Sequence, residues 1–404
     1  MRLSKQQQQK RGEFLYPMSE NPTVLILGTG ASAQGIVEAV ERRDRNFLLV
    51  GANGSDVLVS RFGKERWANI DYSVDKESLL DLIERHQVKA VIPGSNDAAY
   101  RMCLALKAHC DLVGIDIPNV GHAICSKSEF AIHADRAGLT IPKTISGKTT
   151  DILKQEFDIP DNGALILKPD DQHSGLGTKV FYRPNQLESE LNSRAYGEAT
   201  VVIQQFIRGH HFSVSAFLRN QTVARYCSAS EVISTQYGAR WVEKSIAPAL
   251  LAPSIIHDAM IALEKFAHYL GLCDGLIHGQ FIHDHQTDSV YCLEVMRRLP
   301  GDLFGYHFEP EGQYHQLYCE GFIASEQNSP AKHDKYRQIP NHSNLRTIHH
   351  HESKGGILDT KDVVTFIGAK KKSFQLGGMG NSSVGFNKKT KITFEEVKLI
   401  KSPV

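Results

Sequence analysis

The sequence lacks any apolar run near the ~20 residues that a membrane-spanning helix needs. It also lacks a charge bias, because 46 Lys and Arg residues face 45 Asp and Glu residues, whereas nucleic-acid-binding domains are typically basic. The polar segment that precedes residue 21 has no apolar core of a signal peptide. We therefore expect no membrane or nucleic-acid partner, and a disordered tail over residues 1–21. The sequence leaves open whether Met1 or Met18 begins the natural chain.

The seven cysteines form neither a CxxC pair nor another metal-site spacing. An odd number of cysteines in a long chain also disfavours a disulfide framework, so we expect reduced thiols and a cytoplasmic protein. The remaining composition, 41% hydrophobic and 23% charged over 404 residues, is typical of a globular protein with two or three domains.

The first strong pattern is an apolar strand, residues 23–28, followed by a G-x-G-x-x-A turn at 28–33 and a helix. Such a turn can bind a pyrophosphate at the helix N-terminus. The second strand, 47–51, leads to Asn53 with no acidic residue placed to hold a ribose, which disfavours an NAD-dependent enzyme. Two other interpretations stay open: the glycines allow close strand–helix packing, or the turn holds one end of a substrate.

A third strand over residues 88–93 ends in the loop 94–97. Strands alternating with helices predict a Rossmann-like, doubly wound domain over residues 22–118. Ligands of open α/β sheets bind beyond the carboxyl ends of the strands, so the loop is a candidate binding segment. A purely structural role is the alternative.

The central pattern of the chain is a short apolar strand, residues 164–167, that ends in Lys168 and precedes a loop with Ser174, Gly175 and Gly177. Glycines let backbone N–H groups converge on anionic oxygens, and a lysine adds a charge aimed at phosphate. No Walker G-x-x-x-x-G-K-[ST] motif is present. The pattern indicates a nucleoside-triphosphate clamp, although an ordinary hairpin shares its local chemistry.

A helix is predicted from Ser126, which forms a capping box with Glu129, to a C-terminal glycine at Gly138. Lys127 is unusual in its first turn, because helix N-termini favour acidic residues. Its position suggests a nearby anion.

The second half of the chain is predicted to be rich in strands. Residues 201–207 and 212–218 have the turn chemistry of a hairpin. A polar linker then begins at residue 327, and short strands are predicted over residues 344–404.

Two further strands, 279–283 and 289–295, are predicted to pair. The second carries Glu294 near its end, followed by Arg297 and Arg298. A carboxylate beside two arginines at a strand end suits a cation with phosphate on its far side. A surface salt bridge is the alternative.

Taken in order, these motifs resemble the ATP-grasp superfamily, especially its carboxylate–amine ligases, over about residues 22–325. The resemblance implies a mixed α/β and α+β fold. It would consist of the Rossmann-like domain at 22–118, an ATP-grasp nucleotide-binding domain at 119–326, and a linker with a small β-rich C-terminal domain at 327–404.

The resemblance also implies the residues of an active site. Those implied for ATP are Lys127, Lys168, Ser174, Gly175, Gly177, Gln204, Gln205, Phe206, Ile207 and His211. Glu294 and Gln280 would hold Mg²⁺, while Lys168 and Arg298 would be catalytic. Arg297 and Asp302 are candidates for substrate contact.

Three positions depart from the family pattern. Met296 stands where the family usually has Asn, Gln280 where it usually has a carboxylate, and His211 where it often has Glu. A side-chain carbonyl oxygen of glutamine can still bind magnesium, whereas methionine offers no oxygen.

The function that the resemblance implies is an ADP-forming ligase that joins a carboxylate to an amine through an acyl phosphate. The alternative is an inactive, ATP-binding regulatory protein. The acid, the amine and a homodimeric state stay open at this point.

Overall fold

In the computed structural model, the described residues are 23–30, 33–43, 45–52, 57–153, 163–170, 177–193, 199–234, 241–301, 304–309, 313–323, 335–341, 347–353, 373–376 and 389–395. The predicted tail, Asn53, Ser174, Gly175 and Asp302 lie outside these ranges.

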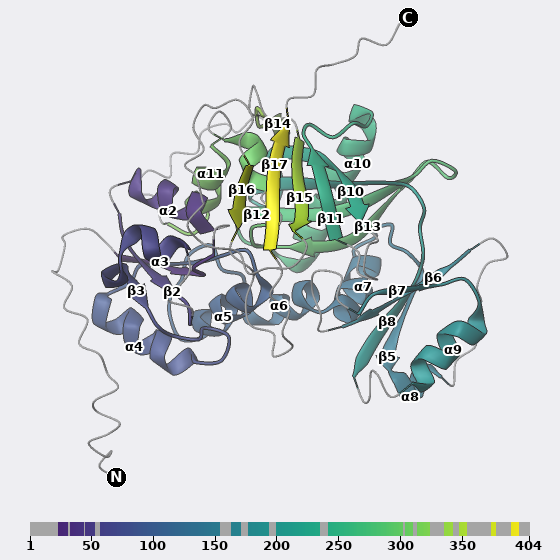
Figure 1. The fold of residues 1–404 in the computed structure, drawn as a ribbon, viewed down its shortest axis with the longest axis horizontal. Helices are drawn as coiled ribbons and strands as arrows, with labels where there is room; N and C mark the ends of the chain where they lie inside the picture. The colour runs from purple at the N-terminus through teal and green to yellow at the C-terminus, as the bar shows by residue number, and fades with distance from the viewer. Residues whose placement is uncertain are drawn as a thin grey trace, which may run out of the picture.

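The N-terminal part is a parallel sheet of four strands in the order β3-β2-β1-β4, with helices packed against it (Figure 1). The strands are β1 (Thr23–Leu27), β2 (Asn46–Val50), β3 (Trp67–Ala68) and β4 (Ala90–Pro93). The helices are α2 (Gln34–Glu41), α3 (Val57–Phe62), η2 (Lys64–Arg66), α4 (Lys76–His86) and α5 (Asp97–Lys107). Strands β1 and β4 are almost wholly buried, as expected at the centre of a parallel sheet. The predicted Rossmann-like fold is confirmed, and β3 is an additional short strand.

The turn after β1 uses its first glycine for backbone geometry. Gly28 has a φ of 140°, which side chains rarely adopt, and its N–H donates to Val50 O over 2.9 Å. Gly35, in the first turn of α2, lies so close to His315 that an added Cβ would come within 2.5 Å of the imidazole ring. Backbone conformation therefore accounts for Gly28, and close packing accounts for Gly35.

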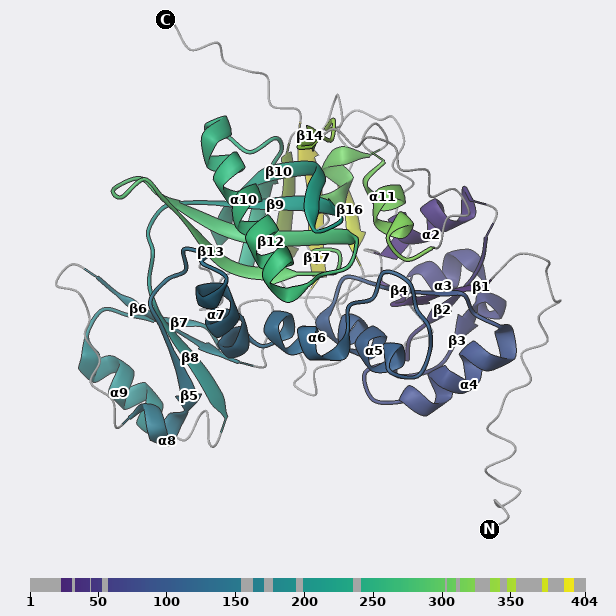
Figure 2. The ribbon, with the colours of Figure 1, turned by 180° about the vertical axis from the view of Figure 1, so that it is seen from behind.

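A smaller antiparallel sheet follows, in the order β5-β8-β6-β7. It contains β5 (Thr144–Lys148), β6 (Leu165–Pro169), β7 (Lys179–Phe181) and β8 (Thr200–Gln205), with α8 (Thr149–Ile152) and α9 (Pro184–Asn192). A separate apolar core, including Leu167, Leu187 and Ile203, joins this sheet to its helices. The sheet projects from the rest of the molecule in both views (Figures 1 and 2).

The third sheet has nine strands and the main path β13-β12-β9-β10-β11-β15-β17-β16, with β14 beside β10. Its first strands are β9 (His210–Arg219), β10 (Thr222–Ser234), β11 (Trp241–Ile246), β12 (Gly275–Asp284) and β13 (Ser289–Met296). The others are β14 (Arg337–Gln338), β15 (Thr347–Ser353), β16 (Ser373–Leu376) and β17 (Lys389–Glu395). Strands β15, β16 and β17 lie in the region predicted to form a small β-rich C-terminal domain, and they belong to this large sheet.

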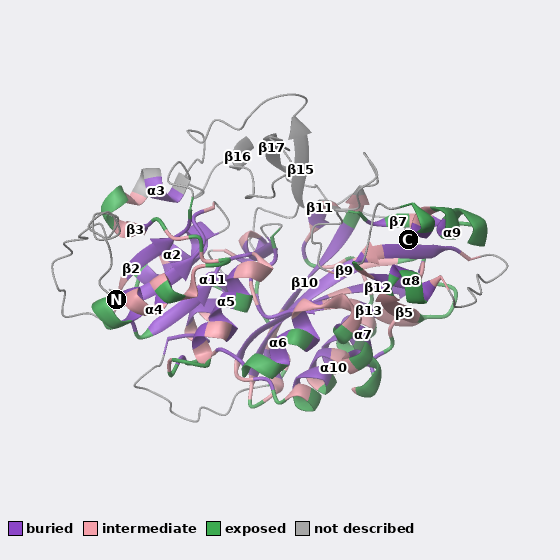
Figure 3. Ribbon diagram, turned by 90° about the horizontal axis from the view of Figure 1, so that it is seen from below, coloured by how far each residue is buried: buried purple, intermediate pink, exposed green. Residues whose placement is uncertain are grey.

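Four further helices and a short 3-10 helix surround the large sheet. They are α6 (Pro118–Cys125), α7 (Lys127–Arg136), α10 (Pro253–Leu270), η4 (Phe304–Phe308) and α11 (Tyr314–Glu320). Helix α10 ends, as predicted, at Gly271 in the left-handed conformation. Strands β9 and β12 are mostly buried between these helices (Figure 3).

The predicted hairpin of residues 201–207 and 212–218 is wrong. Strand β8 pairs with β5 and β6, whereas β9 pairs with β10 and β12, so the chain crosses between two sheets here. An added Cβ at Gly209 would lie 2.1 Å from His283 O. The glycine is thus required by the close approach of β12, and it resembles a hairpin glycine only in the sequence.

The predicted capping box is confirmed in one half. Ser126 Oγ accepts a hydrogen bond from Glu129 N over 3.2 Å, which caps α7. The Ser126 N–H, however, donates to His122 O in the preceding helix, so the reciprocal bond to Glu129 is replaced. Because α6 ends at Cys125, directly before Ser126, the Ser126 N–H is already hydrogen-bonded within α6 and is not available to Glu129.

Candidate active site

The start of α7 is joined to the end of β6 by a dense set of hydrogen bonds. Lys127 Nζ donates to the carbonyl oxygens of Pro169 and Asp170, each over 3.1 Å. The Asp170 carboxylate accepts from Ser128 N over 2.8 Å and from the hydroxyls of Ser126 and Ser128. The anion at this helix N-terminus is therefore supplied by Asp170, which the sequence reading missed. Lys127 is brought to the carboxyl end of the strand that carries Lys168.

Lys168 is held by Gln204, which is itself fixed by Thr144 of the small sheet. Its Nζ donates to Gln204 Oε1 over 2.7 Å, and Gln204 Nε2 donates to Thr144 Oγ1 over 2.9 Å. Because Gln204 is buried and both ends of its amide are engaged, it positions the lysine. Lys127 and Lys168 thus both lie at the carboxyl end of β6.

The segment after Gln204 is also held by its backbone. Gln205 N donates to Lys143 O, and Phe206 N donates to Ala164 O over 2.8 Å. The contacts of Gln205, Phe206 and Ile207 with the nucleotide stay predictions. Because the N–H groups of Gln205 and Phe206 are already hydrogen-bonded, backbone contacts with the nucleotide would use other groups.

Helix α7 lies between the small sheet and the edge of the large one. It contacts β5, β8 and β13, and the Cys292 N–H of β13 donates to Thr140 O just after the helix. The arrangement is visible in both ribbon views (Figures 1 and 2). Helix α7 therefore connects the small sheet, which carries Lys168, to β13, which carries Glu294.

Glu294 and Gln280 face each other across β13 and β12. Directly opposed residues of antiparallel strands project to the same face. Among the residues that the structure describes, the Glu294 carboxylate has no hydrogen-bond or ion-pair partner. On the other side, Gln280 Nε2 lies 3.5 Å from both carboxylate oxygens of Glu231 in β10. Glu231 is a buried acidic residue that the sequence reading missed.

A buried polar chain continues along the same face. His278 Nδ1 lies 2.7 Å from Ser215 Oγ, which lies 2.8 Å from Tyr314 OH. Burial, with a smaller effect of the Arg298 charge, lowers the pKa of His278 to about 3, so the ring is neutral at pH 7. Met296 is its cross-strand partner. The position where the family has Asn thus adjoins a neutral imidazole.

Arg298 connects the end of β13 to the loop that the sequence marked as a binding segment. Its Nε donates to Asp97 Oδ1 over 2.7 Å, and its Nη1 donates to the carbonyl oxygens of Ser95 and Leu299, each over 2.9 Å. The N-terminal sheet therefore contributes to the same region as Glu294. The predicted catalytic role of Arg298 stays a prediction.

Arg297 points into the interior, which corrects its assignment to substrate contact. Its Nε donates to Asp116 Oδ2 over 2.9 Å, both side chains are 2% exposed, and its other nitrogens donate to backbone carbonyls, including Cys273 O. Tyr100 OH also donates to Asp116 over 2.6 Å. Two adjacent arginines look alike in sequence, but alternation along the chain sends one inward and leaves the other near the site.

The remaining predicted residues are only partly placed. Gly177 has a φ of 69°, and an added Cβ would lie 2.7 Å from a ring carbon of Pro169, so glycine is required there. His211 lies in β9, two residues before Ser213, which is the cross-strand partner of Gln280. Ser174, Gly175 and Asp302 lie outside the described residues.

The donor set fits a magnesium-bound nucleotide. Within the described ranges, no group of three or more His, Cys, Asp and Glu residues is arranged as a metal site. Glu294 and the carbonyl oxygen of Gln280 would therefore share the cation with phosphate oxygens and water, the environment that Mg²⁺ commonly has in proteins.

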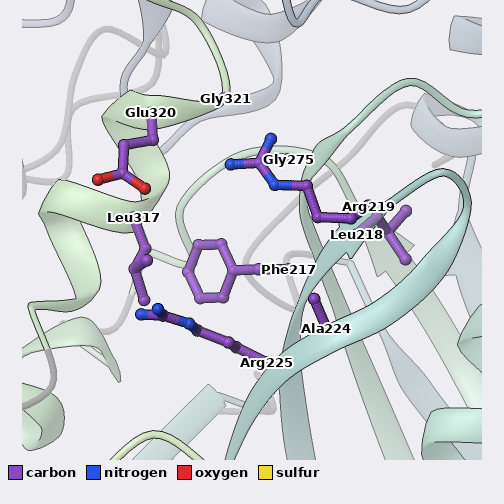
Figure 4. Close-up of a pocket in the computed structure, with 9 residues that line it drawn as sticks. All are labelled: Phe217, Leu218, Arg219, Ala224, Arg225, Gly275, Leu317, Glu320 and Gly321. Atoms are coloured by element: carbon purple, nitrogen blue, oxygen red, sulfur yellow. The ribbon is translucent and has the colours of Figure 1, made fainter. Parts of the chain in front are cut away.

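A cavity of about 80 Å³ lies elsewhere, between the start of β12, the β9–β10 hairpin and α11 (Figure 4). Its lining combines apolar residues with charged ones: Phe217, Leu218, Arg219, Ala224, Arg225, Gly275, Leu317, Glu320 and Gly321. None of the predicted site residues lines it, and its size is small for a nucleotide. In the described part of the chain, no helix has the length and apolar character needed to cross a membrane.

No family model matches the chain. The chain is 25% identical over 139 residues to the D-alanine–D-alanine ligase of Rickettsia akari (strain Hartford), which covers 34% of this chain and 43% of that protein. It is 26% identical over 183 residues to the D-alanine–D-alanine ligase of Trichlorobacter lovleyi, and this match covers 45% of this chain and 56% of that protein. The chain thus spans about half the length of the curated relatives it matches.

The fold is similar to that of solved structures over nearly their whole length. N5-carboxyaminoimidazole synthetase from Staphylococcus aureus, complexed with ADP, has a TM-score of 0.65 at 14% identity, covering 84% of this chain and 85% of that one. The L-amino acid ligase from Bacillus licheniformis has a TM-score of 0.67 at 14% identity, covering 93% and 94%. The carboxyaminoimidazole ribonucleotide synthase from Aspergillus clavatus, complexed with ATP, reaches 0.68 at 12% identity, also covering 93% and 94%. The chain thus has the three-sheet fold of these solved structures, and over part of its length its sequence is similar to that of D-alanine–D-alanine ligases.

Proposed function

We propose that this protein is an ADP-forming ligase that joins a carboxylate to an amine through an acyl phosphate, with ATP and Mg²⁺. The observation that carries the proposal is the half-buried Glu294 carboxylate, which faces Gln280 across two paired strands and has no hydrogen-bond or ion-pair partner among the described residues. An ionised carboxylate held this way suits a cation.

The reaction needs activation of the acid, because an oxide is a poor leaving group from a carboxylate and phosphate is a good one. An oxygen of the substrate carboxylate attacks the γ-phosphorus of ATP, and the bond from that phosphorus to the β,γ-bridging oxygen breaks. This forms an acyl phosphate and ADP. The amine then attacks the acyl carbon, loses a proton and displaces phosphate, which leaves an amide.

In this scheme the protein mainly positions the reactants and neutralises charge. Lys127 and Lys168 bind the α- and β-phosphates, while backbone N–H groups of Gly175 and Gly177, with Ser174, cover the β- and γ-phosphates. Arg298 stabilises the transferring phosphoryl group. Glu294 and Gln280 would hold Mg²⁺, which when bound offsets the negative charge that builds up on the phosphates.

An amino acid is the substrate class that we propose, for the acid, the amine or both. The support is the similarity to D-alanine–D-alanine ligases and the fold likeness to an L-amino acid ligase. Asp302 stays a candidate for substrate contact. We also propose a cytoplasmic protein, supported by seven cysteines that are all free thiols.

ADP release tests the proposal. The protein is incubated with ATP and MgCl₂ and with pools of amino acids and amines, each pool alone and then together. ADP formation that requires both an acid and an amine, and that is lost in Glu294→Gln, supports the ligase. Tight ATP binding without turnover in any pool would instead indicate a regulatory nucleotide-binding protein.

A further inference from the structure

We propose that Glu231 is a positioning residue for the cation site: it orients the Gln280 amide so that the carbonyl oxygen of Gln280 faces the metal. This inference rests on the proposed function. It explains how a neutral glutamine can stand where related sites use a carboxylate.

The first step is the contact itself. Gln280 Nε2 lies 3.5 Å from Glu231 Oε1 and 3.5 Å from Oε2, so the amide group is centred on the carboxylate. The distances are long for a hydrogen bond, and the orientation therefore depends on the attraction between a full charge and the amide dipole. Glu231 is only 7% exposed, so water screens this attraction weakly.

The second step is the strand order, which decides where the amide oxygen points. The order is β13-β12-β9-β10, so Glu231 and Glu294 lie on opposite sides of Gln280. A carboxylate only accepts hydrogen bonds, so the NH₂ group of Gln280 turns toward Glu231. The carbonyl oxygen is consequently directed away from β10, which is the side where Glu294 of β13 lies.

The third step concerns the space above β9, across which the Gln280 side chain contacts Glu231. Its cross-strand partner in β9 is Ser213, and Ser213 is opposite Ala229 in β10. Both side chains are small, which leaves space above β9 for the contact with Glu231, two residues beyond Ala229. Ser213 is fully buried, and its hydroxyl has no hydrogen-bond partner among the described residues.

Removing the charge of Glu231 would let the amide rotate by half a turn and present its NH₂ group to the cation. Residues that orient metal ligands typically change metal affinity by 10–100-fold when they are replaced. We therefore expect Glu231→Gln to weaken metal binding by about tenfold.

The test uses the full chain, MnCl₂ as a spectroscopic probe and a non-hydrolysable ATP analogue, with Mn²⁺ affinity measured by electron paramagnetic resonance. Glu231→Gln is compared in the wild-type background and in Gln280→Ala. If Glu231 acts through Gln280, Glu231→Gln lowers Mn²⁺ affinity at least about fivefold more in the wild-type background than in Gln280→Ala. Such a difference is the coupling expected for two residues in contact. Equal losses in both backgrounds, or no loss in the wild-type background, would overturn the proposal.

An exchange of the two side chains sharpens the test. In Gln280→Glu with Glu231→Gln, the amide donates from position 231 and a carboxylate faces the metal, so Mn²⁺ should bind at least as tightly as in wild type. Gln280→Glu alone places two carboxylates side by side and should bind Mn²⁺ less tightly than the exchanged pair. Weaker binding by the exchanged pair than by the single variant would contradict the inference.

Controls separate this proposal from the function on which it rests. Glu264 accepts from Val223 N and Tyr336 OH, each over 2.7 Å, away from this site, so Glu264→Gln should leave Mn²⁺ affinity unchanged. Unaltered Mn²⁺ binding in Glu294→Gln would remove the proposed cation site, whereas loss there with none in Glu231→Gln would remove only the role of Glu231. If Glu231→Gln does not fold, Glu231→Ser removes the charge with a smaller side chain, and Mn²⁺ affinity equal to wild type in that variant would also overturn the inference.

Discussion

Arg298 and Asp97 are 201 residues apart in the chain and joined by a hydrogen bond of 2.7 Å between Arg298 Nε and Asp97 Oδ1. The bond links the end of β13 in the large sheet to the first residue of α5 in the N-terminal part. The Arg298 side chain is 11% exposed, so this ion pair is partly shielded from water. The N-terminal part is therefore held against the predicted phosphoryl-transfer region.

Asp97→Ala should destabilise the protein and slow the reaction. Losing a hydrogen bond to a charged group costs about 1.5–3 kcal/mol of unfolding free energy. A displaced Arg298 should lower kcat by about 100-fold, the scale of a 1 Å misplacement. Denaturant unfolding and ADP release measure the two effects. Asp81→Ala, which removes an exposed pair with Arg85, is the control and should change neither quantity appreciably. Wild-type kcat in Asp97→Ala would show that Arg298 is not positioned by this bond.

Lys168→Ala should weaken ATP binding while the fold survives. The lysine lies at a strand end and is aimed by Gln204, and a hydrogen bond to a charged group contributes about 1.5–3 kcal/mol. Calorimetry with an ATP analogue measures the affinity. Lys179→Ala is the matched control, because Lys179 pairs with Glu190 on the surface of the same small sheet. ATP binding by Lys168→Ala as tight as that of wild type would show that the clamp is assigned to the wrong lysine.

Glu294→Gln should abolish phosphoryl transfer and leave nucleotide affinity mostly intact. The substitution removes the protein charge that faces the cation but keeps the lysines of the small sheet. ADP formation and the dissociation constant of the ATP analogue are measured on the same preparation. Glu264→Gln, a carboxylate outside the site, should retain turnover. Substantial turnover in Glu294→Gln would place the cation elsewhere.

Asp116→Asn should lower stability without raising the KM for substrate, because the partner of Asp116 is the buried Arg297. Breaking one side of a buried ion pair costs about 3–5 kcal/mol. A rise in KM with unchanged stability would instead restore Arg297 as a substrate contact. Denaturant unfolding and steady-state kinetics give the two quantities.

The same pair predicts how stability depends on pH. Burial by itself raises the pKa of Asp116, but the charge and hydrogen bonds of Arg297 outweigh it and leave the pKa below its ordinary value. The ionised carboxylate therefore contributes stability above the ordinary pKa of about 3.9, and this is lost as pH falls through the native pKa. The stability difference between wild type and Asp116→Asn should shrink in acid. A difference that is constant down to about pH 3 would contradict this assignment.

The elements that depend on local chemistry can be predicted from the amino-acid sequence. The apolar runs that became β1 and β4, the Ser126 cap of α7 and the Gly271 end of α10 follow from burial, capping and backbone freedom within a few residues. The pairing of Gln280 with Glu294 was also predictable, because a short turn joins their strands. The order of these motifs was enough to indicate the fold.

Contacts between side chains that are distant in the sequence depend on how the sheets are arranged. In the sequence, Gly209 is typical of a hairpin turn. In the structure, the chain crosses between two sheets here, and glycine is required because β12 approaches closely. Arg297 and Arg298 are chemically identical neighbours, yet Asp116 draws one into the interior and Asp97 holds the other near the site. Glu231 meets Gln280 across an intervening strand. Strand order and register place such residues, and both are set by burial summed over whole sheets, which no local pattern contains.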